Sequence, residues 1–441
     1  MSGFSARDPL AASPRIQVLS AYLKEPKSST AMKTFDIPII YRSPLITAIK
    51  KKRKQQDKMK KDFTPTMLDF GPLQIMLARH FGFCYGVENA IEIAFKILDE
   101  NPGKRVFLLS EMIHNPHVNS DLRDRGVRFI MDTSGKQLLP WEEITSEDIV
   151  IIPAFGTTRE IEARLRDIGI DTRHYNTTCP FVERVWNKAE SIGEKDFTVI
   201  VHGKPGHEET RATFSHSRTH TPTIMVRDMK EARLLADFML GRRPAREFEE
   251  VFRGQYSSGF DIEKDLLHVG VVNQTTMLAH ETQAIADFFK QVMAEKYGDD
   301  NEDGLQEHFA DTKDTLCYAT NDNQNAIRQI LNEDADLAIV VGGYNSSNTS
   351  HLVELCEEKM PTYFVSSENK LLSEQEILHW DCGLAKEIKT TGYLPVKEPI
   401  RIIITSGASC PDALVEGVIR RLLSFYGLEN KIEQMIEAYD G

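Results

Sequence analysis

Three cysteines each stand directly before a helical pattern of apolar residues. Cys84 precedes such a pattern from Val87 to Leu98, and Cys179 and Cys317 precede similar ones. A helix N-terminus carries partial positive charge and favours the thiolate, which is the form of cysteine that attacks electrophiles and binds metals. A single buried cysteine is more often a small apolar core residue. Three cysteines in one setting indicate a shared chemical role instead.

Long separations between these cysteines exclude the compact metal motifs, because zinc ribbons and bacterial ferredoxin clusters use C-x2-C pairs. Convergence in space requires three similar α/β units arranged about a centre, each contributing one thiolate. A fourth protein ligand would close such a site, whereas an open position would let a metal bind substrate. Cys410 also opens an amphipathic pattern and is the rival fourth ligand, so the residues alone leave three and four cysteines open. Cys356 is predicted to lie in the core of a helix.

Six apolar, β-branched runs supply the strands that must position these cysteines. Each run is continuous rather than alternating, and helical patterns lie between the runs, which is typical of buried strands in parallel sheets. The runs cover residues 105–110, 148–156, 197–203, 268–276, 337–343 and 400–407. The predicted fold class is therefore α/β, with parallel sheets and flanking helices.

The loops after these runs are rich in Gly, Ser, Thr, Asn and His. They read SEMIHNPHVNS, GTTRE, GKPGHEET, NQTTM, GGYNSSNTS and SGASCP. Ligands of open parallel sheets bind outside the carboxyl ends of the strands, where hydroxyls, amides, imidazoles and main-chain N–H groups suit a phosphate-bearing anion. No loop has the GxGxxG or GxxxxGK[ST] pattern, and Arg211 occupies the second histidine position of HExxH. Dinucleotide, P-loop and zincin chemistry are therefore not supported.

The chain of 441 residues has the composition of a globular protein and a formal net charge of -13. This charge argues against sequence-independent binding of nucleic acid. The sequence shows neither an apolar run long enough to span a membrane nor a secretory signal. We therefore expect a cytoplasmic protein with no nucleic-acid and no membrane partner. Residues 49–61 are strongly basic, and we predict residues 1–70 to be an N-terminal extension with a basic linker.

Eight motifs, taken in order, resemble those of the LytB/IspH family of 4-hydroxy-3-methylbut-2-enyl diphosphate reductases. They are FGFCYGV, EMIHNPHV, TTCPFVERV, GKPGHEE, NQTTM, CYATNDNQ, GGYNSSNTSHL and SGASCPDALV. The resemblance implies the last step of the methylerythritol phosphate route to isoprenoids, in which an allylic diphosphate loses a hydroxyl group reductively. It also implies three similar α/β lobes around one central 4Fe-4S cluster per chain. We expect the lobes at residues 71–178, 179–312 (with an insertion) and 313–441 (with a C-terminal helix).

By motif position, the resemblance assigns the site residues to three groups. The ligands of the cluster, which leave one iron open, are Cys84, Cys179 and Cys317. Glu209 is the implied acid, with Thr275 near the substrate oxygen. The implied diphosphate ligands are His114, His207, Ser346, Asn348 and Ser409. The family usually has a small residue that is not a ligand at the position of Cys410, and its electron donor is ferredoxin or flavodoxin.

Two departures from the family pattern stand out. Phe155 occupies a position where many members have a histidine that contacts the diphosphate, and Thr157, Thr158 or Arg159 would be the alternative donors. The second departure is a longer stretch between GHEE and NQTT. In it we predict His216 and His220 to be residues of a surface loop.

The phenylalanine form with a long extension resembles the branch found in plants, cyanobacteria and some other bacteria. A plastid stroma is thus the alternative location if residues 1–70 include a transit peptide. Two alternative functions stay open: an iron-sulfur sensor or electron carrier on the same fold, and a structural zinc protein with Cys410 as fourth ligand. A sensor would not need Glu209, Thr275 or the diphosphate loops, which this chain retains. We therefore predict a reductase.

Overall fold

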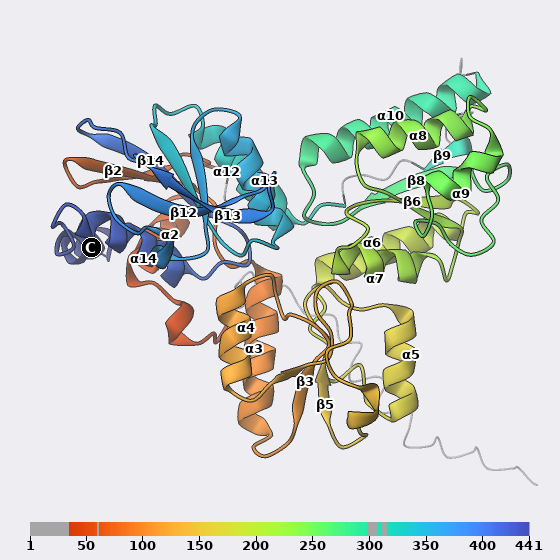
Figure 1. Cartoon of the computed structure of the whole chain (residues 1–441), viewed down its shortest axis with the longest axis horizontal. Coiled ribbons are helices and arrows are strands. Elements are labelled where there is room, and N and C mark those ends of the chain that lie inside the picture. Colours follow the sequence, from red (N-terminus) through yellow and green to blue (C-terminus); the bar gives the residue numbers. More distant parts are fainter. Residues whose placement is uncertain (1–34, 60, 299–304, 306, 311–314, 441) are drawn as a thin grey trace, which may run out of the picture. The chain divides into compact units, whose positions relative to one another are not determined.

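The structure is a computed structural model that describes residues 35–59, 61–298, 305, 307–310 and 315–440 (Figure 1). The chain divides into two compact units, Met1–Asp36 and Ile37–Gly441, and the description below concerns the second. This unit is a mixed α/β fold of three sheets with flanking helices, so the predicted fold class is confirmed. No helix in the described part of the chain has the length and apolar character needed to cross a membrane.

The helices are α2 (Pro44–Gln56), α3 (Tyr85–Glu100), α4 (Pro116–Asp124), α5 (Arg159–Ile168), α6 (Pro180–Gly193), α7 (Glu208–Ser217), α8 (Met229–Met239), α9 (Phe248–Val251), α10 (Ala279–Tyr297), α12 (Tyr318–Ile330), α13 (Ser347–Glu357), α14 (Asp412–Ser424) and α15 (Lys431–Asp440). Short 3-10 helices are η1 (Ile39–Tyr41), η2 (Trp141–Glu143), η3 (Ala245–Glu247) and η4 (Glu368–Lys370). The strands are β1 (Thr66–Asp69), β2 (Leu73–Leu77), β3 (Val106–Leu108), β4 (Arg128–Phe129), β5 (Ile149–Ile151), β6 (Thr198–His202), β7 (Thr223–Val226), β8 (Val269–Asn273), β9 (Phe309–Ala310), β10 (Leu337–Val341), β11 (Thr362–Val365), β12 (Glu376–Asp381), β13 (Lys386–Thr391) and β14 (Ile400–Ser406).

Each sheet defines one lobe. Lobe 1 holds the order β4-β3-β5, lobe 2 the order β7-β6-β8-β9, and lobe 3 the order β1-β2-β14-β10-β11-β12-β13. All six predicted runs form strands, and they pair in parallel as β3 with β5, β6 with β8, and β10 with β14. Figure 1 shows α3 and α4 beside one face of the lobe 1 sheet and α5 beside the other. The continuous apolar runs are thus parallel strands covered on both faces, as their sequence indicates.

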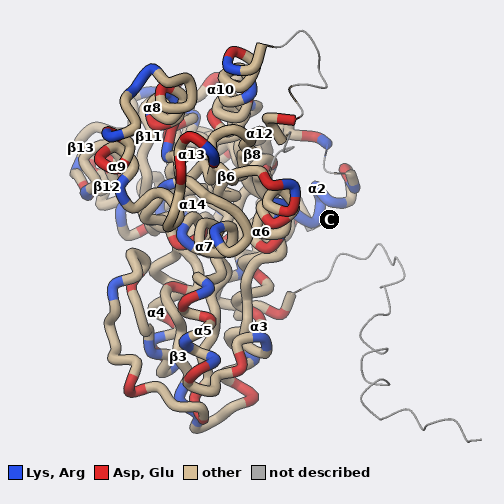
Figure 2. Tube along the Cα trace, turned by 90° about the vertical axis from the view of Figure 1, so that its right-hand side faces the viewer, with Lys and Arg blue, Asp and Glu red and all other residues tan. Residues whose placement is uncertain are grey.

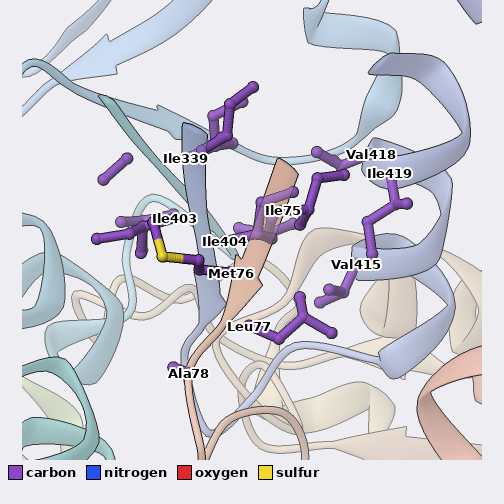
Figure 3. Packing of buried hydrophobic residues seen from close by; sticks show 14 of the residues in the cluster. Ile75, Met76, Leu77, Ala78, Ile339, Ile403, Ile404, Val415, Val418 and Ile419 are labelled. Carbon is purple, nitrogen blue, oxygen red and sulfur yellow. The ribbon is translucent and has the colours of Figure 1, made fainter. Parts of the chain in front are cut away.

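Strand β2 belongs to lobe 3, although it lies within the range 71–178 that we expected for lobe 1. It pairs in parallel with β14, with Ile75 opposite Ile402. Figure 3 shows Ile75 and Leu77 on the side of β2 that faces helix α14, and Met76 on the other side. The sequence does not reveal this placement, because a strand that is apolar on both faces can join any covered parallel sheet.

The basic stretch forms part of helix α2 rather than a linker, and the blue segments along α2 in Figure 2 mark its Lys and Arg residues. Leu45, Ile46 and Ile49 of α2 are buried in the apolar core of lobe 3. Lys50 forms an ion pair with Asp412 at the start of α14, with 2.8 Å between Nζ and Oδ1. Because α2 is a helix with a buried apolar face, the prediction of a linker is wrong. The many charged residues of this stretch concealed the apolar face in the sequence.

Buried Arg53 links α2 to the segment that leads to Cys84. Its guanidinium donates to the carbonyl oxygens of Ala78 (3.0 Å), Arg79 (3.0 Å) and Leu77 (3.2 Å). These carbonyls follow or end β2. Arg53 therefore satisfies backbone acceptors that would otherwise be buried without a partner.

We expect Arg53→Ala to lower the free energy of unfolding by about 1–3 kcal/mol, because buried acceptors lose their donor. Urea unfolding of the two proteins measures the difference. The matched control is Lys54→Ala, since Lys54 is exposed on the same helix and its loss should cost less than about 0.5 kcal/mol. Equal effects of the two variants would show that the carbonyl contacts do not matter for stability.

Candidate functional site

The three cysteines occupy equivalent positions, because Cys84, Cys179 and Cys317 are the N-cap residues of α3, α6 and α12. This confirms that each thiol stands at a helix start. The backbone N–H of each cysteine also donates to a carbonyl in a loop that follows a parallel strand. The pairs are Cys84 with Ala408 (3.1 Å), Cys179 with Ala154 (2.9 Å) and Cys317 with Thr275 (3.2 Å). The same local arrangement therefore occurs three times, once after each of β14, β5 and β8.

Each cysteine also follows a segment of one lobe and opens a helix of the next. Cys84 comes after β2 of lobe 3 and opens α3 beside the lobe 1 sheet. Cys179 comes shortly after Asn176, which forms a parallel bridge with Ile152 next to β5 of lobe 1. Cys179 then opens α6, which packs on the lobe 2 sheet. Cys317 comes after β9 of lobe 2 and opens α12, whose apolar face is in the lobe 3 core. The thiols therefore mark the crossings between lobes.

The pKa of each of the three thiols is raised, chiefly by burial. Burial raises the pKa of Cys84, and the nearby Cys317 and Cys179 raise it further. Burial likewise raises the pKa of Cys179 to about 11. Burial raises the pKa of Cys317 as well, against the effect of the Thr320 N–H, which donates to its sulfur at 3.4 Å. A bound cationic group would be needed to keep all three groups as thiolates.

Gly86 provides the space that the second thiol needs. A Cβ added to Gly86 would lie 2.5 Å from Sγ of Cys179, so the first turn of α3 and this thiol are in close contact. The residues present thus fit a group held jointly by several thiolates. Among the described residues, no three His, Cys, Asp or Glu side chains are close enough to hold a single metal ion.

Cys410 differs from these three cysteines because it is not an N-cap residue: α14 begins at Asp412, and its N-cap is Pro411. Cys410 is fully buried in the apolar core of lobe 3, and its thiol contacts the carbonyl of Pro411 at 3.6 Å. Cys356, which the sequence places in a helix core, is buried in α13 of the same lobe. The location of Cys410 gives no support to the hypothesis of a zinc site with this residue as fourth ligand.

We expect Gly86→Ala to bind less than half of the wild-type iron after anaerobic purification, because the new methyl group would occupy space next to Sγ of Cys179. Iron per chain is the measurement. Gly206→Ala is the control, since nothing lies within 4 Å of a Cβ at Gly206. Full iron binding by Gly86→Ala would show that the structure accommodates the added methyl group beside Cys179 without affecting the site.

Glu209 and Thr275 form a buried pair at the loop that also binds Cys317. The hydroxyl of Thr275 donates to Oε2 of Glu209 at 3.0 Å, and the backbone N–H of Thr275 donates to Oε1 at 2.5 Å. Burial raises the pKa of Glu209 to about 7, although the two bonds from Thr275 act in the opposite direction. A carboxyl group with such a pKa can carry a proton near neutral pH and release it, which is what a general acid requires.

His114 and Glu208 form a buried ion pair, with 3.1 Å between Nε2 and Oε2. Burial alone would lower the pKa of His114, but the hydrogen bond and the charge of Glu208 outweigh it and raise this pKa. The other ring nitrogen of His114 lies 2.6 Å from the carbonyl of Asn345, and Ser110 donates to Glu208. Glu208 therefore favours the protonated form of His114, whose imidazole in lobe 1 lies against a loop of lobe 3.

His207 and Phe155 complete an aromatic cluster around His114. The ring of His207 stacks on His114 with 4.9 Å between centroids. Burial and the charge of His114 keep the pKa of His207 well below its usual range. Phe155 meets His114 edge-on at 4.2 Å and His207 at 5.9 Å. Phe155 thus packs against the two imidazoles and offers no hydrogen-bond donor to an anion.

The hydroxyl and amide residues of lobe 3 lie next to this cluster. Ser409 donates from Oγ to the carbonyl of His114 at 3.1 Å, and its Oγ is 3.5 Å from Oγ of Ser346. A Cβ on Gly343 would lie 2.4 Å from the same carbonyl, so the loop after β10 also approaches His114 closely. Three of the predicted diphosphate residues are thereby in contact.

Asn348 connects the polar residues to the cysteines. Its Oδ1 accepts from the N–H of Ala408 at 2.9 Å, and the carbonyl of Ala408 accepts from the N–H of Cys84. Its Nδ2 is 3.4 Å from Oγ1 of Thr320, which lies 3.1 Å from Sγ of Cys317. The predicted anion site and two of the predicted cluster ligands are therefore adjacent.

The sequence analysis missed two residues of the site, Glu208 and Thr320, and placed a third, His216, wrongly. Glu208 and Thr320 were not singled out, although the acidic pair in GHEE and the threonine one turn after Cys317 were visible signals. His216 is buried at the end of α7 rather than in a surface loop, because its ring stacks on Trp186 with 3.6 Å between centroids. The prediction is confirmed for His220, which is exposed in the turn after α7, with its Nδ1 3.7 Å from Oε1 of Glu190.

Comparisons with known proteins agree with this geometry. The family model described as LytB protein matches residues 75–423. A curated 4-hydroxy-3-methylbut-2-enyl diphosphate reductase from Synechococcus sp. (strain CC9311) is 40% identical over 358 residues, which cover 81% of this chain and 87% of that protein. One from Crocosphaera subtropica is 40% identical over 354 residues, which cover 80% of this chain and 85% of that protein.

A solved structure supports the fold. It is titled the E-1-hydroxy-2-methyl-but-2-enyl-4-diphosphate reductase from Plasmodium falciparum, and it matches 84% of this chain and 99% of its own with a TM-score of 0.57 and 19% identity. The matched residues 75–423 and the two curated relatives identify the protein class. The chain belongs to the LytB family of 4-hydroxy-3-methylbut-2-enyl diphosphate reductases.

Proposed function

We propose that the chain reduces (E)-4-hydroxy-3-methylbut-2-enyl diphosphate to isopentenyl and dimethylallyl diphosphates, the last step of the methylerythritol phosphate pathway. Cys84, Cys179 and Cys317 would hold one 4Fe-4S cluster with one open iron. When bound, this cluster supplies two electrons, one at a time, and a Lewis-acidic iron. The observation that carries the proposal is that two of the three equivalent thiols, Cys84 and Cys317, are linked to the polar residues through Asn348 and Thr320.

The diphosphate is bound by the residues around His114. The protonated imidazole provides positive charge, and hydroxyl and amide groups add neutral hydrogen bonds. The ligands we assign are His114, His207, Ser346, Asn348 and Ser409. Loops of all three lobes contribute, since His114 belongs to lobe 1, His207 to lobe 2 and the others to lobe 3.

Glu209 supplies the proton for the departing hydroxyl group. Overall, the substrate takes up two electrons and two protons, the C–O bond breaks, and water leaves. Glu209 is buried and uncharged below about pH 7, and Thr275 holds both of its oxygens in place. A neutral carboxylic acid can give its proton to the leaving oxygen, which makes water the leaving group instead of hydroxide.

The electron donor we propose is ferredoxin or flavodoxin, since either carries single electrons at low potential. The cyanobacterial relatives favour a bacterial cytoplasm or, if residues 1–70 include a transit peptide, a plastid stroma. Activity and localisation of a protein lacking these residues would distinguish the two locations.

Electron paramagnetic resonance of the anaerobically purified, reduced protein tests the proposal against its alternatives. We expect a brown protein with iron and acid-labile sulfide, whose signal changes when the allylic diphosphate is added. A signal unaffected by the diphosphate would favour an iron-sulfur sensor or electron carrier. A colourless protein with stoichiometric zinc would contradict the proposal outright.

A further inference from the structure

Helix α7 joins the diphosphate residues to the loop of residues 154–160, which we call the Phe155 loop. His207 is the N-cap of α7, so the helix starts within the aromatic cluster. Near its other end, Nε2 of His216 lies 3.1 Å from the carbonyl of Thr157. Oγ of Ser215 accepts from the N–H of Arg159 at 3.0 Å. One helix therefore contacts the Phe155 loop both directly and through His207.

Trp186 of α6 holds the same loop from a second side. Its indole ring stacks on His216 with 3.6 Å between centroids and 18° between planes, and its Nε1 donates to Oγ1 of Thr213 at 3.2 Å. A Cβ on Gly156 would lie 2.4 Å from the indole, so the backbone of the loop passes directly against it. Gly156 also has a φ of +74°, a conformation that favours glycine.

His216 is suited to act as a fixed donor. Burial and, to a lesser extent, the charge of Arg159 lower its pKa to about 4, so the ring is neutral at neutral pH. The carbonyl of Thr157 accepts a hydrogen bond and cannot donate one, so the proton of the neutral ring is on Nε2. Glu162 is the nearest carboxylate, at 3.9 Å from Nε2. The stack on Trp186 fixes the plane of the ring, and the bond to Thr157 fixes the loop.

We infer that Trp186 and His216 are positioning residues that clamp the Phe155 loop. By holding this loop, they keep Phe155 packed against His114 and His207, and they thereby set the affinity of the site for the diphosphate group. The inference rests on the proposed function, because it takes the pair of His114 and His207 as diphosphate ligands. Phe155 cannot donate to an anion, so its contribution is to keep the two imidazoles in place and to exclude water from one side. Both effects require the loop to hold its position.

Binding of inorganic pyrophosphate to the anaerobic holoprotein, measured by calorimetry, tests the clamp without turnover. We expect His216→Ala to weaken this binding roughly tenfold and to raise KM for the substrate by a similar factor, with kcat changed less than about twofold. His216→Gln, which keeps a donor, and His216→Phe, which keeps a ring on Trp186, should each lie between wild type and His216→Ala. Trp186→Leu should resemble His216→Ala.

His308→Ala is the matched control. His308 is stacked on Tyr297 with 3.5 Å between centroids, and its Nδ1 lies 2.9 Å from the carbonyl of Leu267, before β8 begins. It thus has the same kinds of contact, a ring stack and a bond to a carbonyl, next to the start of β8. Wild-type pyrophosphate affinity in His216→Ala, or an equal loss in His308→Ala, would overturn the clamp. A wild-type protein that does not bind pyrophosphate would overturn the diphosphate site itself, and the clamp with it.

Discussion

Glu209→Gln is expected to reduce kcat about 10²–10⁴-fold, the range that one general acid contributes, while iron content stays at the wild-type value. The amide fills the same space and can still contact Thr275, but it has no proton to give to a leaving hydroxyl group. The side chain of Glu209 accepts hydrogen bonds from Thr275, and the backbone N–H of Glu209, which the substitution keeps, donates to Nδ1 of His207 at 3.2 Å. The variant should therefore bind the substrate and keep the cluster.

The pH dependence of turnover gives a second measure of Glu209. Because burial raises its pKa to about 7, the acid form dominates below that pH, and the wild-type rate should fall as the pH rises through about 7. This decrease in rate with rising pH should be absent from the residual activity of Glu209→Gln. Glu281→Gln is the control, since burial also raises the pKa of Glu281 on α10 and its side chain makes no hydrogen bond to a site residue in the described part of the chain. Near-normal turnover in Glu209→Gln would assign the acid role to another group.

Replacing any one of the three helix-capping cysteines is expected to abolish stable cluster binding. In Cys84→Ser, Cys179→Ser and Cys317→Ser, the cluster would keep only two thiolate ligands, and we expect iron per chain to fall to less than a fifth of the wild-type value. Cys410→Ala should bind iron normally, because its thiol lies in the lobe 3 core. Iron and acid-labile sulfide in anaerobic preparations measure both outcomes.

The Cys410 variant is the decisive control. A loss of iron in Cys410→Ala, with its fold intact by circular dichroism, would show that the site has a fourth cysteine ligand and no open position. Cys356→Ala is a second control, because it replaces another buried cysteine of lobe 3 and should not change the iron content per chain. The contrast between these variants and the N-cap cysteines separates a specific ligand role from general damage to the core.

The parallel sheets were predictable because their strands are long apolar runs. β6, β8, β10 and β14 are buried on both faces, and such runs have few alternatives in a chain of this composition. The helices after the cysteines were predictable for a related reason, since the pattern from Val87 to Phe95 has helical period and is buried in α3. Local patterns of this kind need no knowledge of distant residues.

The remaining features depend on contacts between distant parts of the chain. β2 joins β14, more than three hundred residues later, and nothing in LQIML selects that partner. Helix α2 is charged in sequence, yet its apolar side docks on lobe 3. His216 is buried because Trp186 covers it, although its neighbours Ser215 and Ser217 suggest a surface loop. The proximity of the three cysteines is likewise a property of the crossings between lobes, which spacing alone does not determine.

Product analysis tests the central claim most directly, which is that the three N-cap thiols and the adjacent polar residues perform one reductive dehydroxylation. The anaerobic protein is mixed with (E)-4-hydroxy-3-methylbut-2-enyl diphosphate and reduced methyl viologen, and the products are separated by chromatography. We predict isopentenyl and dimethylallyl diphosphates, with two viologen radicals consumed per substrate. A protein that contains its full cluster and is reduced by viologen, yet leaves the substrate unchanged, would contradict the account.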